Sequence, residues 1–209
     1  MTTSKEYDNI TVCRTVSIPL GARFRAMKKL PTLLCVFLLS ACAPSEVPSE
    51  KLLERNGIKY TINSQIPFTG FSTEYYENGQ LHYKVTYKDG AKNGPYQYYH
   101  ESGQLYYKST YKDGEINGPY EHYHENGQLK FKATYKDGVE NGLYEYYYEN
   151  GQLGEKITYK DGVENGPYEY YHESGQLNSK STYKDGELNG LWEMYHENGQ
   201  LEEKVNYKD

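Results

Sequence analysis

Four histidines recur at one position of a 24-residue period and raise the possibility of metal chemistry. They are His100, His124, His172 and His196. Imidazole nitrogens are common zinc ligands, and each ligand atom must lie about 2 Å from the ion. If one period corresponds to two strands of a sheet, neighbouring copies lie roughly 9–10 Å apart. The histidines then cannot share one ion, and the sequence predicts no metal site.

The carboxylates are candidates for general acid–base chemistry. An active site needs one asymmetric group of residues with shifted pKa values. Here nearly every Asp and Glu has equivalents at the same position of other copies, and the Asp residues fall in turns, where their conformational tolerance is needed. The chain also has no phosphate-cradling Gly loop and no kinase Asp motif. We therefore predict a protein without enzymatic activity, catalytic residues or a cofactor.

A row of tyrosines is a candidate binding surface and not a catalytic site. Its members follow one another at intervals of 24 residues: Tyr75, Tyr99, Tyr123, Tyr147, Tyr171 and Tyr195. Tyrosine is enriched among the residues that dominate protein interfaces. The row is a candidate anchor for a partner protein or a glycan. The alternative is that these rings only cover the strands beside each turn.

Cys42 follows a segment with the pattern of a secretion signal. Met27, Lys28 and Lys29 form a short positive region, and an apolar run leads from Leu30 to Ala41. That run has 12 residues, whereas a membrane-spanning helix needs about 20. The pattern therefore predicts a signal peptide over residues 27–41. Residues 1–26 have no domain-like pattern, so the natural start is either Met27 or an extended N-terminus.

The sequence Leu39-Ser40-Ala41-Cys42 resembles the lipobox of bacterial lipoproteins. The resemblance implies that a diacylglycerol is attached to the Cys42 thiol and that the chain is cut before it. Ala43, in place of Asp, implies sorting to the outer membrane. A secretion peptide with a bystander cysteine, or a buried helix, would be the alternative.

The chain that remains after such a cut is acidic. Residues 1–41 contain six Lys or Arg and two Asp or Glu, so 17 positive and 27 negative side chains remain, a net charge of −10. Cys42 is then the only cysteine, which excludes a disulfide within one chain. With no basic tract, nucleic acid is not an expected partner. The acyl chains would hold the protein at the membrane.

The elements that position these residues repeat without insertion. One unit begins at Asn117, and its residues 117–138 hold two strands with alternating patterns and two turn signals, Asn126-Gly127 and Asp137-Gly138. Two more residues lead to the next Asn-Gly. Both signals predict two-residue type I′ turns, in which both central residues have positive φ. Two copies have Ser102 and Ser174 in place of the asparagine.

Pairing the strands around Asn126-Gly127 gives the sheet two different faces. We call them the aromatic face and the lysine face. The aromatic face is expected to hold the pairs His124–Leu129, His122–Phe131 and Tyr120–Ala133. The lysine face is expected to hold the pairs Tyr123–Lys130, Glu121–Lys132 and Pro119–Thr134, and the same register pairs Glu145–Lys156, Glu169–Lys180 and Glu193–Lys204. Opposite charges across strands each contribute about 0.2–1 kcal/mol.

Composition decides how thick the structure can be. Leu, Ile, Val and Phe make up 37 of 209 residues, a fraction low enough to suggest disorder. The 26 tyrosines and one tryptophan supply the missing apolar area. We predict an all-β fold, a single-layer antiparallel meander of about 12 strands and roughly 55 Å. Its expected divisions are a tether over 42–56, a degenerate capping unit over 57–74 and the repeat array over 75–209.

The segment from Tyr135 to Tyr144 resembles the MORN repeat, with an aromatic residue, a turn glycine, variable residues, Asn-Gly and an aromatic residue. The 24-residue spacing and the Tyr-x-Glu-Asn-Gly-Gln-Leu turn resemble the bacterial variant, often named a YwqK-type antitoxin family. The likeness covers residues 70–209. It implies single-layer hairpin arrays used for membrane association or protein docking, without catalytic residues.

These observations together predict a non-enzymatic, lipid-anchored adaptor that docks another protein of the bacterial cell envelope. A second hypothesis is an antitoxin or immunity-like protein that neutralises one cognate toxin. A third is direct binding of phospholipid or glycan by the sheet.

Overall fold

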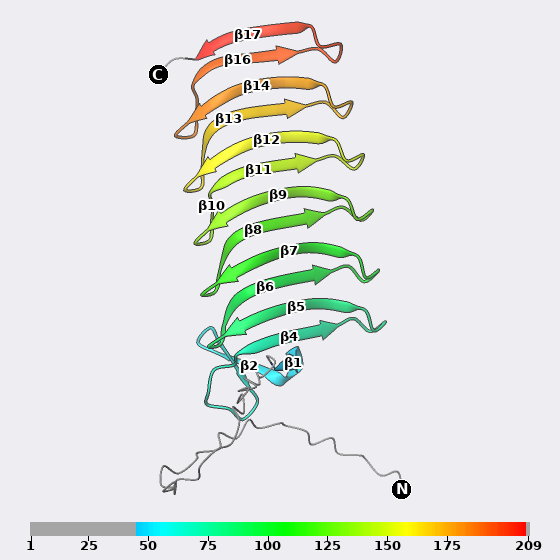
Figure 1. Ribbon diagram of the computed structural model, residues 1–209, viewed down its shortest axis with the longest axis vertical. Coiled ribbons are helices and arrows are strands. Elements are labelled where there is room, and N and C mark those ends of the chain that lie inside the picture. Colours follow the sequence, from blue (N-terminus) through cyan, green and yellow to red (C-terminus); the bar gives the residue numbers. More distant parts are fainter. Residues whose placement is uncertain (1–44, 208–209) are drawn as a thin grey trace, which may run out of the picture. The chain divides into compact units, whose positions relative to one another are not determined.

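The computed structural model describes residues 45–207, which form a stack of strands in chain order (Figure 1). Their elements are β1 (Glu46–Pro48), the 3-10 turn η1 (Ser49–Lys51), β2 (Leu52–Arg55), β3 (Ile58–Thr61), β4 (Gly70–Tyr75), β5 (Leu81–Lys88), β6 (Ala91–Tyr99), β7 (Leu105–Lys112), β8 (Glu115–Tyr123), β9 (Leu129–Lys136), β10 (Val139–Glu140), β11 (Gly142–Tyr147), β12 (Leu153–Lys160), β13 (Val163–Tyr171), β14 (Leu177–Lys184), β15 (Glu187–Leu188), β16 (Gly190–Tyr195) and β17 (Leu201–Tyr207).

The strands from β4 to β17 form one antiparallel meander. Each pairs with the strand before and after it in the chain, and β10 and β15 are short pieces that lead into β11 and β16. Twelve main strands therefore follow one another after β1 in this sheet, within the described residues. The predicted all-β single-layer meander, with its 24-residue unit of two strands, is confirmed.

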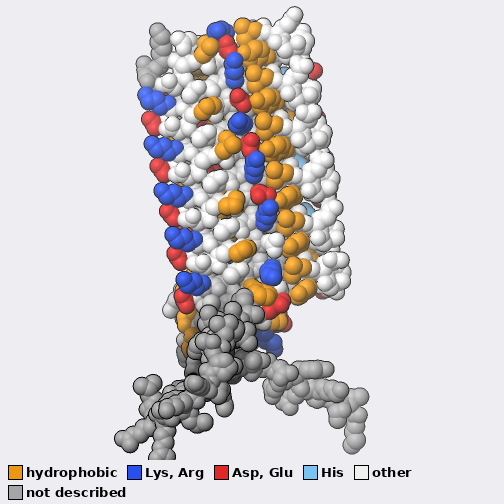
Figure 2. All heavy atoms as spheres, viewed as in Figure 1, with side chains coloured by type: hydrophobic (Ala, Val, Ile, Leu, Met, Phe, Trp, Pro, Cys, Tyr) orange, Lys and Arg blue, Asp and Glu red, His pale blue; other side chains and the backbone are white. Residues whose placement is uncertain are grey.

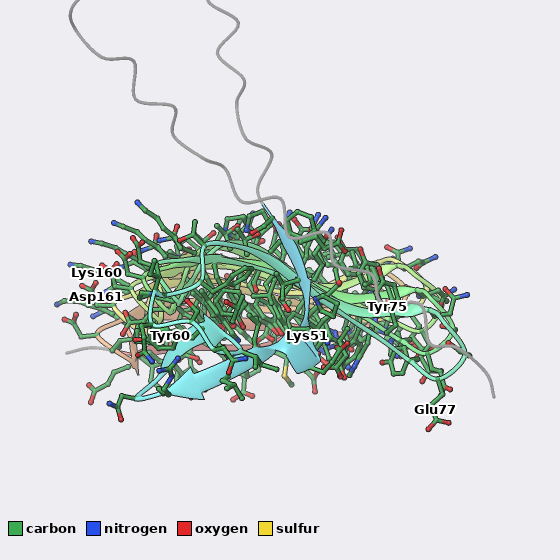
Figure 3. All side chains as sticks on the ribbon, turned by 90° about the horizontal axis from the view of Figure 1, so that it is seen from below. Lys51, Tyr60, Tyr75, Glu77, Lys160 and Asp161 are labelled. Carbon is green, nitrogen blue, oxygen red and sulfur yellow. The ribbon has the colours of Figure 1, made fainter. Side chains whose placement is uncertain are left out.

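The Asp-Gly turns have the predicted geometry. Asp137 and Gly138 have φ values of 49° and 80°, and they leave Lys136 paired directly with Val139. Positive φ at both central residues defines the type I′ turn, whose twist matches that of the flanking strands. These turns line one edge of the sheet, while the Asn-Gly loops line the other, as Lys160 and Asp161 opposite Tyr75 and Glu77 show in Figure 3.

The Asn-Gly loops differ from the prediction of two-residue turns. Gly127 has a φ of 83°, but Asn126 is not among the residues with positive φ. The Gly127 N–H donates to the His124 carbonyl at 2.9 Å, and the His124 N–H donates to the Gln128 carbonyl at 2.8 Å. This is a type I turn followed by a glycine bulge, which gives a three-residue loop.

The asparagine of this loop acts through its side chain. The Asn126 Oδ1 accepts the Gln128 N–H at 2.9 Å, and Nδ2 donates to the Glu149 carbonyl of the next repeat at 3.1 Å. Asn78 and Asn150 make the same bond to Glu101 and Glu173. The loop therefore links neighbouring repeats, which a free type I′ turn would not do.

The longer loop changes where the leucines lie. Tyr123 pairs with Leu129, and a bulge between His122 and Tyr123 leaves Lys130 without a direct partner. Cross-strand partners share a face of the sheet, so Leu129 lies on the lysine face with Tyr123. The expectation that these leucines join the aromatic face is wrong for every copy, including Leu105 and Leu153. Beyond the bulge, the pairs His122–Phe131, Glu121–Lys132 and Pro119–Thr134 form as predicted.

The N-terminal end of the sheet is covered. Strand β1 pairs in parallel with β4, and β2 and β3 form a separate hairpin. Phe68, Val85, Tyr87 and Tyr96 form a small buried cluster there, with Val47 and Leu52 packed against it. The sequence predicts a tether over residues 42–56, whereas residues 46–55 lie in β1, η1 and β2 because their apolar side chains close this end of the core.

Candidate binding surfaces

A ladder of charges runs along the middle of the lysine face. Lys108 lies 2.9 Å from Glu121, Lys132 lies 2.6 Å from Glu145, and Glu193 bridges Lys180 and Lys204 at 2.7 and 3.0 Å. The hydrogen bond that Lys108 donates to Glu121 raises the pKa of Lys108, and the bond that Lys132 donates to Glu145 raises the pKa of Lys132. The registers Glu145–Lys156, Glu169–Lys180 and Glu193–Lys204 are as predicted. The ion pairs of Lys108, Lys132 and Lys180, however, join neighbouring repeats. The ion pairs of the ladder therefore connect neighbouring repeat units.

The predicted tyrosine row lies beside this ladder. The Tyr123, Tyr171 and Tyr195 hydroxyls donate to Glu121, Glu169 and Glu193 at 2.5, 2.9 and 2.8 Å. The Lys108 Nζ lies 5.9 Å from the centre of the Tyr123 ring, within the range of a cation–π contact. Tyr75 is 57% exposed, and the other five tyrosines of the row are partly buried. The hydroxyls of Tyr123, Tyr171 and Tyr195 are engaged within the chain, so the surface that these residues offer is that of the rings.

The leucines turn this row into a continuous apolar stripe. The six tyrosines of the row pair with Leu81, Leu105, Leu129, Leu153, Leu177 and Leu201, in chain order. Figure 2 shows a column of hydrophobic side chains beside a column in which lysines and acids alternate. We call these twelve residues the Tyr–Leu stripe. Sequence reasoning missed its leucine half, because only the bulged loop brings each leucine to this face.

The aromatic face carries a ladder of stacked rings. Rings at successive strands lie 5.4–6.1 Å apart, in the order Tyr83, Tyr96, Tyr107, Tyr120, Phe131 and Tyr144. Burial raises the pKa of Tyr120 to about 12. The ladder ends at Tyr144 because the ladder position on the next strand, β12, holds Glu155, and farther along, on β14, it holds Ser179. The first four repeats and the last two therefore present different aromatic faces.

The histidines border a hollow at the loop edge of the aromatic face. It measures about 560 Å³ and is lined by His100, His122 and His124 with Tyr106 and Lys130 among its neighbours. The His124 Nε2 contacts the Tyr147 carbonyl at 2.9 Å, while His100 Nε2 is buried without a hydrogen-bond partner. Within residues 45–207, no three His, Cys, Asp or Glu side chains are placed to hold a metal ion.

The predicted lipidation site, Cys42, lies outside the described residues. The proposed signal peptide over 27–41 and the segment 1–26 lie outside them as well. In the part of the chain that the structure describes, no helix is long and apolar enough to cross a membrane.

Six consecutive segments match the family model described as the MORN repeat variant. They are residues 70–89, 92–113, 116–137, 140–161, 164–185 and 188–209. The chain belongs to the MORN repeat variant family. The first matched segment begins at β4, five residues before the predicted start of the array at Tyr75. MORN repeat proteins often bind membranes or protein partners, and both faces of this sheet are candidate surfaces for such contacts.

Other comparisons of this MORN repeat chain add little. No curated protein matches it. Among solved structures, a mutant of Staphylococcus aureus TarM in complex with fondaparinux, alpha-GlcNAc-glycerol and UDP is 10% identical with a TM-score of 0.31, over 56% of this chain and 21% of that one. A GtfA/B complex bound to UDP and GlcNAc is 11% identical with a TM-score of 0.20, over 77% of this chain and 29% of that one. Both likenesses are too weak to support an argument, and the chain spans under a third of either protein.

Proposed function

We propose that this MORN repeat protein is a non-enzymatic, lipid-anchored adaptor that docks another protein of the bacterial envelope. Cys42 is the proposed acylated anchor, with the outer membrane as its location. The repeat sheet supplies the docking surface, and the Tyr–Leu stripe is the part of it that carries the contact. The partner is a protein with a long apolar ridge that can follow several repeats.

One observation supports the stripe above other surfaces. It pairs an aromatic ring with a leucine in each of six successive hairpins, and no loop or strand of the described chain covers it. The neighbouring Lys108 and Glu121 neutralise each other, as do Lys132 and Glu145. The stripe therefore offers contact area with little unscreened charge, which favours an apolar partner over an anionic lipid.

The experiment compares two triple variants of the full chain in affinity capture from envelope extract. Changing Tyr123, Tyr147 and Tyr171 to Ala removes the rings, and we expect the captured partner to be lost while the far-UV circular dichroism stays unchanged. The same three positions changed to Phe keep the rings and should retain the partner. A single Tyr→Ala change should weaken binding by about 1 kcal/mol.

Salt separates this proposal from its alternatives. Binding through the stripe should change little between low and moderate salt, because screening acts on exposed charges. If capture instead collapses at moderate salt and survives the triple Ala variant, the lysines make the contact, and an acidic partner or anionic lipid replaces the proposal. Capture of a protein whose toxicity the chain abolishes would favour the antitoxin hypothesis.

A further inference from the structure

Lys92 shows how the aromatic face holds an ammonium group. Its Nζ lies 4.9 Å from the ring centres of both Tyr96 and Tyr111. Those two rings lie 5.8 Å apart and meet edge to face at 76°. A cation within about 6 Å of a ring centre is attracted by the negative face of the ring. The two tyrosines therefore form a binding site for an ammonium group, which we call a seat. Here the ammonium group is that of Lys92, a residue of the same chain.

The same pair of rings recurs farther along the sheet without its lysine. Tyr168 and Tyr183 lie 5.7 Å apart at 79°, matching the pair beside Lys92. The position equivalent to Lys92 holds Glu164, which pairs with Tyr159 as Lys92 pairs with Tyr87. A carboxylate thus stands where the Tyr96–Tyr111 pair has its own cation.

In addition, no ring stacks on the faces of the Tyr168 ring as neighbouring rings do in the ladder. Within the stacked ladder each interior ring lies between two neighbours. On either side of Tyr168 the corresponding positions hold Glu155 and Ser179, which pair across from Tyr170. Among the described residues, the one ring in contact with Tyr168 is that of Tyr183. Both faces of the Tyr168 ring therefore lack the aromatic cover that the ladder supplies elsewhere.

Two carboxylates, Glu155 and Glu164, lie near the Tyr168 ring. Burial raises the pKa of Glu155, and the nearby charge of Glu164 raises it further. Burial raises the pKa of Tyr168 to about 12, with the charge of Glu155 as the next cause. The lysines of the charge ladder pair with Glu121, Glu145 and Glu193, so neither Glu155 nor Glu164 has an ion-pair partner among them. The related Glu140 differs, because it accepts a hydrogen bond from the Tyr135 hydroxyl at 2.9 Å.

We propose that Tyr168, Tyr183, Glu155 and Glu164 form a seat for an alkylammonium group supplied by a ligand. The rings attract the cation as Tyr96 and Tyr111 attract Lys92, and the carboxylates add the opposite charge. The ligand class is an amine on a flexible alkyl chain, as in a lysine side chain, a polyamine or an amine-bearing lipid headgroup. The seat lies on the opposite face from the Tyr–Leu stripe, so its failure would leave the proposed function standing.

The test follows the tyrosine ring resonances of the full chain by NMR during titration with butylammonium chloride. We expect saturable shifts at Tyr168 and Tyr183 but not at Tyr120, which is stacked on both sides. Butanol, an uncharged molecule of similar shape, should produce none. Shifts of equal size with butanol, or equal shifts at every tyrosine, would overturn the proposal.

Variants give the decisive comparison. Glu164→Lys fills the seat as Lys92 does beside Tyr96 and Tyr111, and we expect it to abolish the butylammonium shifts. Glu187→Lys makes the same change in net charge at an exposed position. The affinity of this variant for butylammonium should stay within about twofold of the wild type. If both variants weaken binding equally, the amine follows only the net charge. Glu155→Gln should weaken binding by roughly tenfold without altering the circular dichroism spectrum.

Further titrations identify the source of the amine. A lysine peptide and its acetylated form separate a protein side chain from a nonspecific contact, because acetylation removes the charge. Spermidine represents the polyamines. Vesicles of phosphatidylethanolamine are compared with vesicles of phosphatidylglycerol, which lack an amine. Binding of the acetylated peptide or of phosphatidylglycerol with equal strength would contradict recognition of the ammonium group.

Discussion

At the scale of single residues, Glu193 concentrates the electrostatics of the lysine face. Its carboxylate lies within 3.0 Å of two lysines, Lys180 and Lys204, and accepts the Tyr195 hydroxyl. The hydrogen bond from Lys180, followed by those from Tyr195 and Lys204, lowers the pKa of Glu193 from 4.5 to about 2. The ionised form of this carboxylate therefore contributes to the stability of the fold.

This predicts an acid dependence of stability. A carboxylate whose pKa is lower in the folded than in the unfolded chain stabilises the fold at any pH above its unfolded-state pKa. This stabilisation is lost as the pH falls toward and through the folded-state pKa. Between pH 4.5 and about 2, the free energy of unfolding should fall less steeply in Glu193→Gln than in the wild type. Urea unfolding at several pH values measures this. Glu187→Gln, at an exposed position, should retain the wild-type slope.

Cys42 carries the second prediction at the residue scale. Cys42→Ser removes the thiol to which the proposed diacylglycerol is attached. We expect an uncleaved or unlipidated precursor that no longer sediments with membranes, as metabolic labelling with a fatty acid would show. Absence of label in the wild-type protein would overturn the lipoprotein proposal, whatever the behaviour of the variant.

At the scale of the element, the Asn-Gly loop is the joint between hairpins. Asn126→Ala removes the bond that Oδ1 accepts from the Gln128 N–H and the bond that Nδ2 donates to the Glu149 carbonyl. Each net hydrogen bond is worth about 0.5–1.5 kcal/mol, with the lower end expected at this exposed edge. The thermal unfolding midpoint should fall by a few degrees.

A matched change tests the loop geometry itself. Asn126→Gly would cost little in a two-residue type I′ turn, which accepts glycine at both central positions. In the observed loop the same change removes both side-chain bonds, so it should destabilise at least as much as Asn126→Ala. A neutral Asn126→Gly would contradict the three-residue loop.

At the scale of the whole molecule, the sheet is a chain of nearest-neighbour contacts. Each strand of the array pairs with the strands next to it in sequence, and ion pairs and asparagine bonds join one repeat to the next. In such arrays stability is approximately a sum of local terms. Within residues 45–207 the only other sheet is the β2–β3 hairpin, so most of the array is a single layer whose surface extends over several repeats.

Deleting repeats tests this organisation. Removing residues 118–141, one whole 24-residue unit, joins equivalent backbone positions and should leave a folded array with somewhat lower stability. Removing only 118–129 joins strands of the wrong direction and should unfold the neighbouring hairpins. Circular dichroism and urea unfolding distinguish the two. Equal damage from both deletions would contradict the 24-residue unit.

Much of the fold was determined by the sequence alone, because it depends on local chemistry. Asp137-Gly138 supplies two residues that tolerate positive φ, so the tight turn follows from residue type. The alternation of Glu121 and Tyr123 against Lys132 then fixes which residues share a face. The period of these signals gives the number and order of the strands without any long-range information.

Tertiary structure decided the features that depend on the next repeat. The form of the Asn-Gly loop rests in part on a bond from Asn126 to Glu149, 23 residues away, and its bulge moves Leu129 to the lysine face. In sequence, Val47 and Leu52 lie in a segment with the pattern of a linker, whereas in the structure they pack against the core around Phe68. Likewise, Glu155 and Ser179 are ordinary strand residues in sequence. Only the packing shows that they leave the Tyr168 ring without a stacked ring on either side. These outcomes depend on contacts between units, which a pattern read along one unit does not contain.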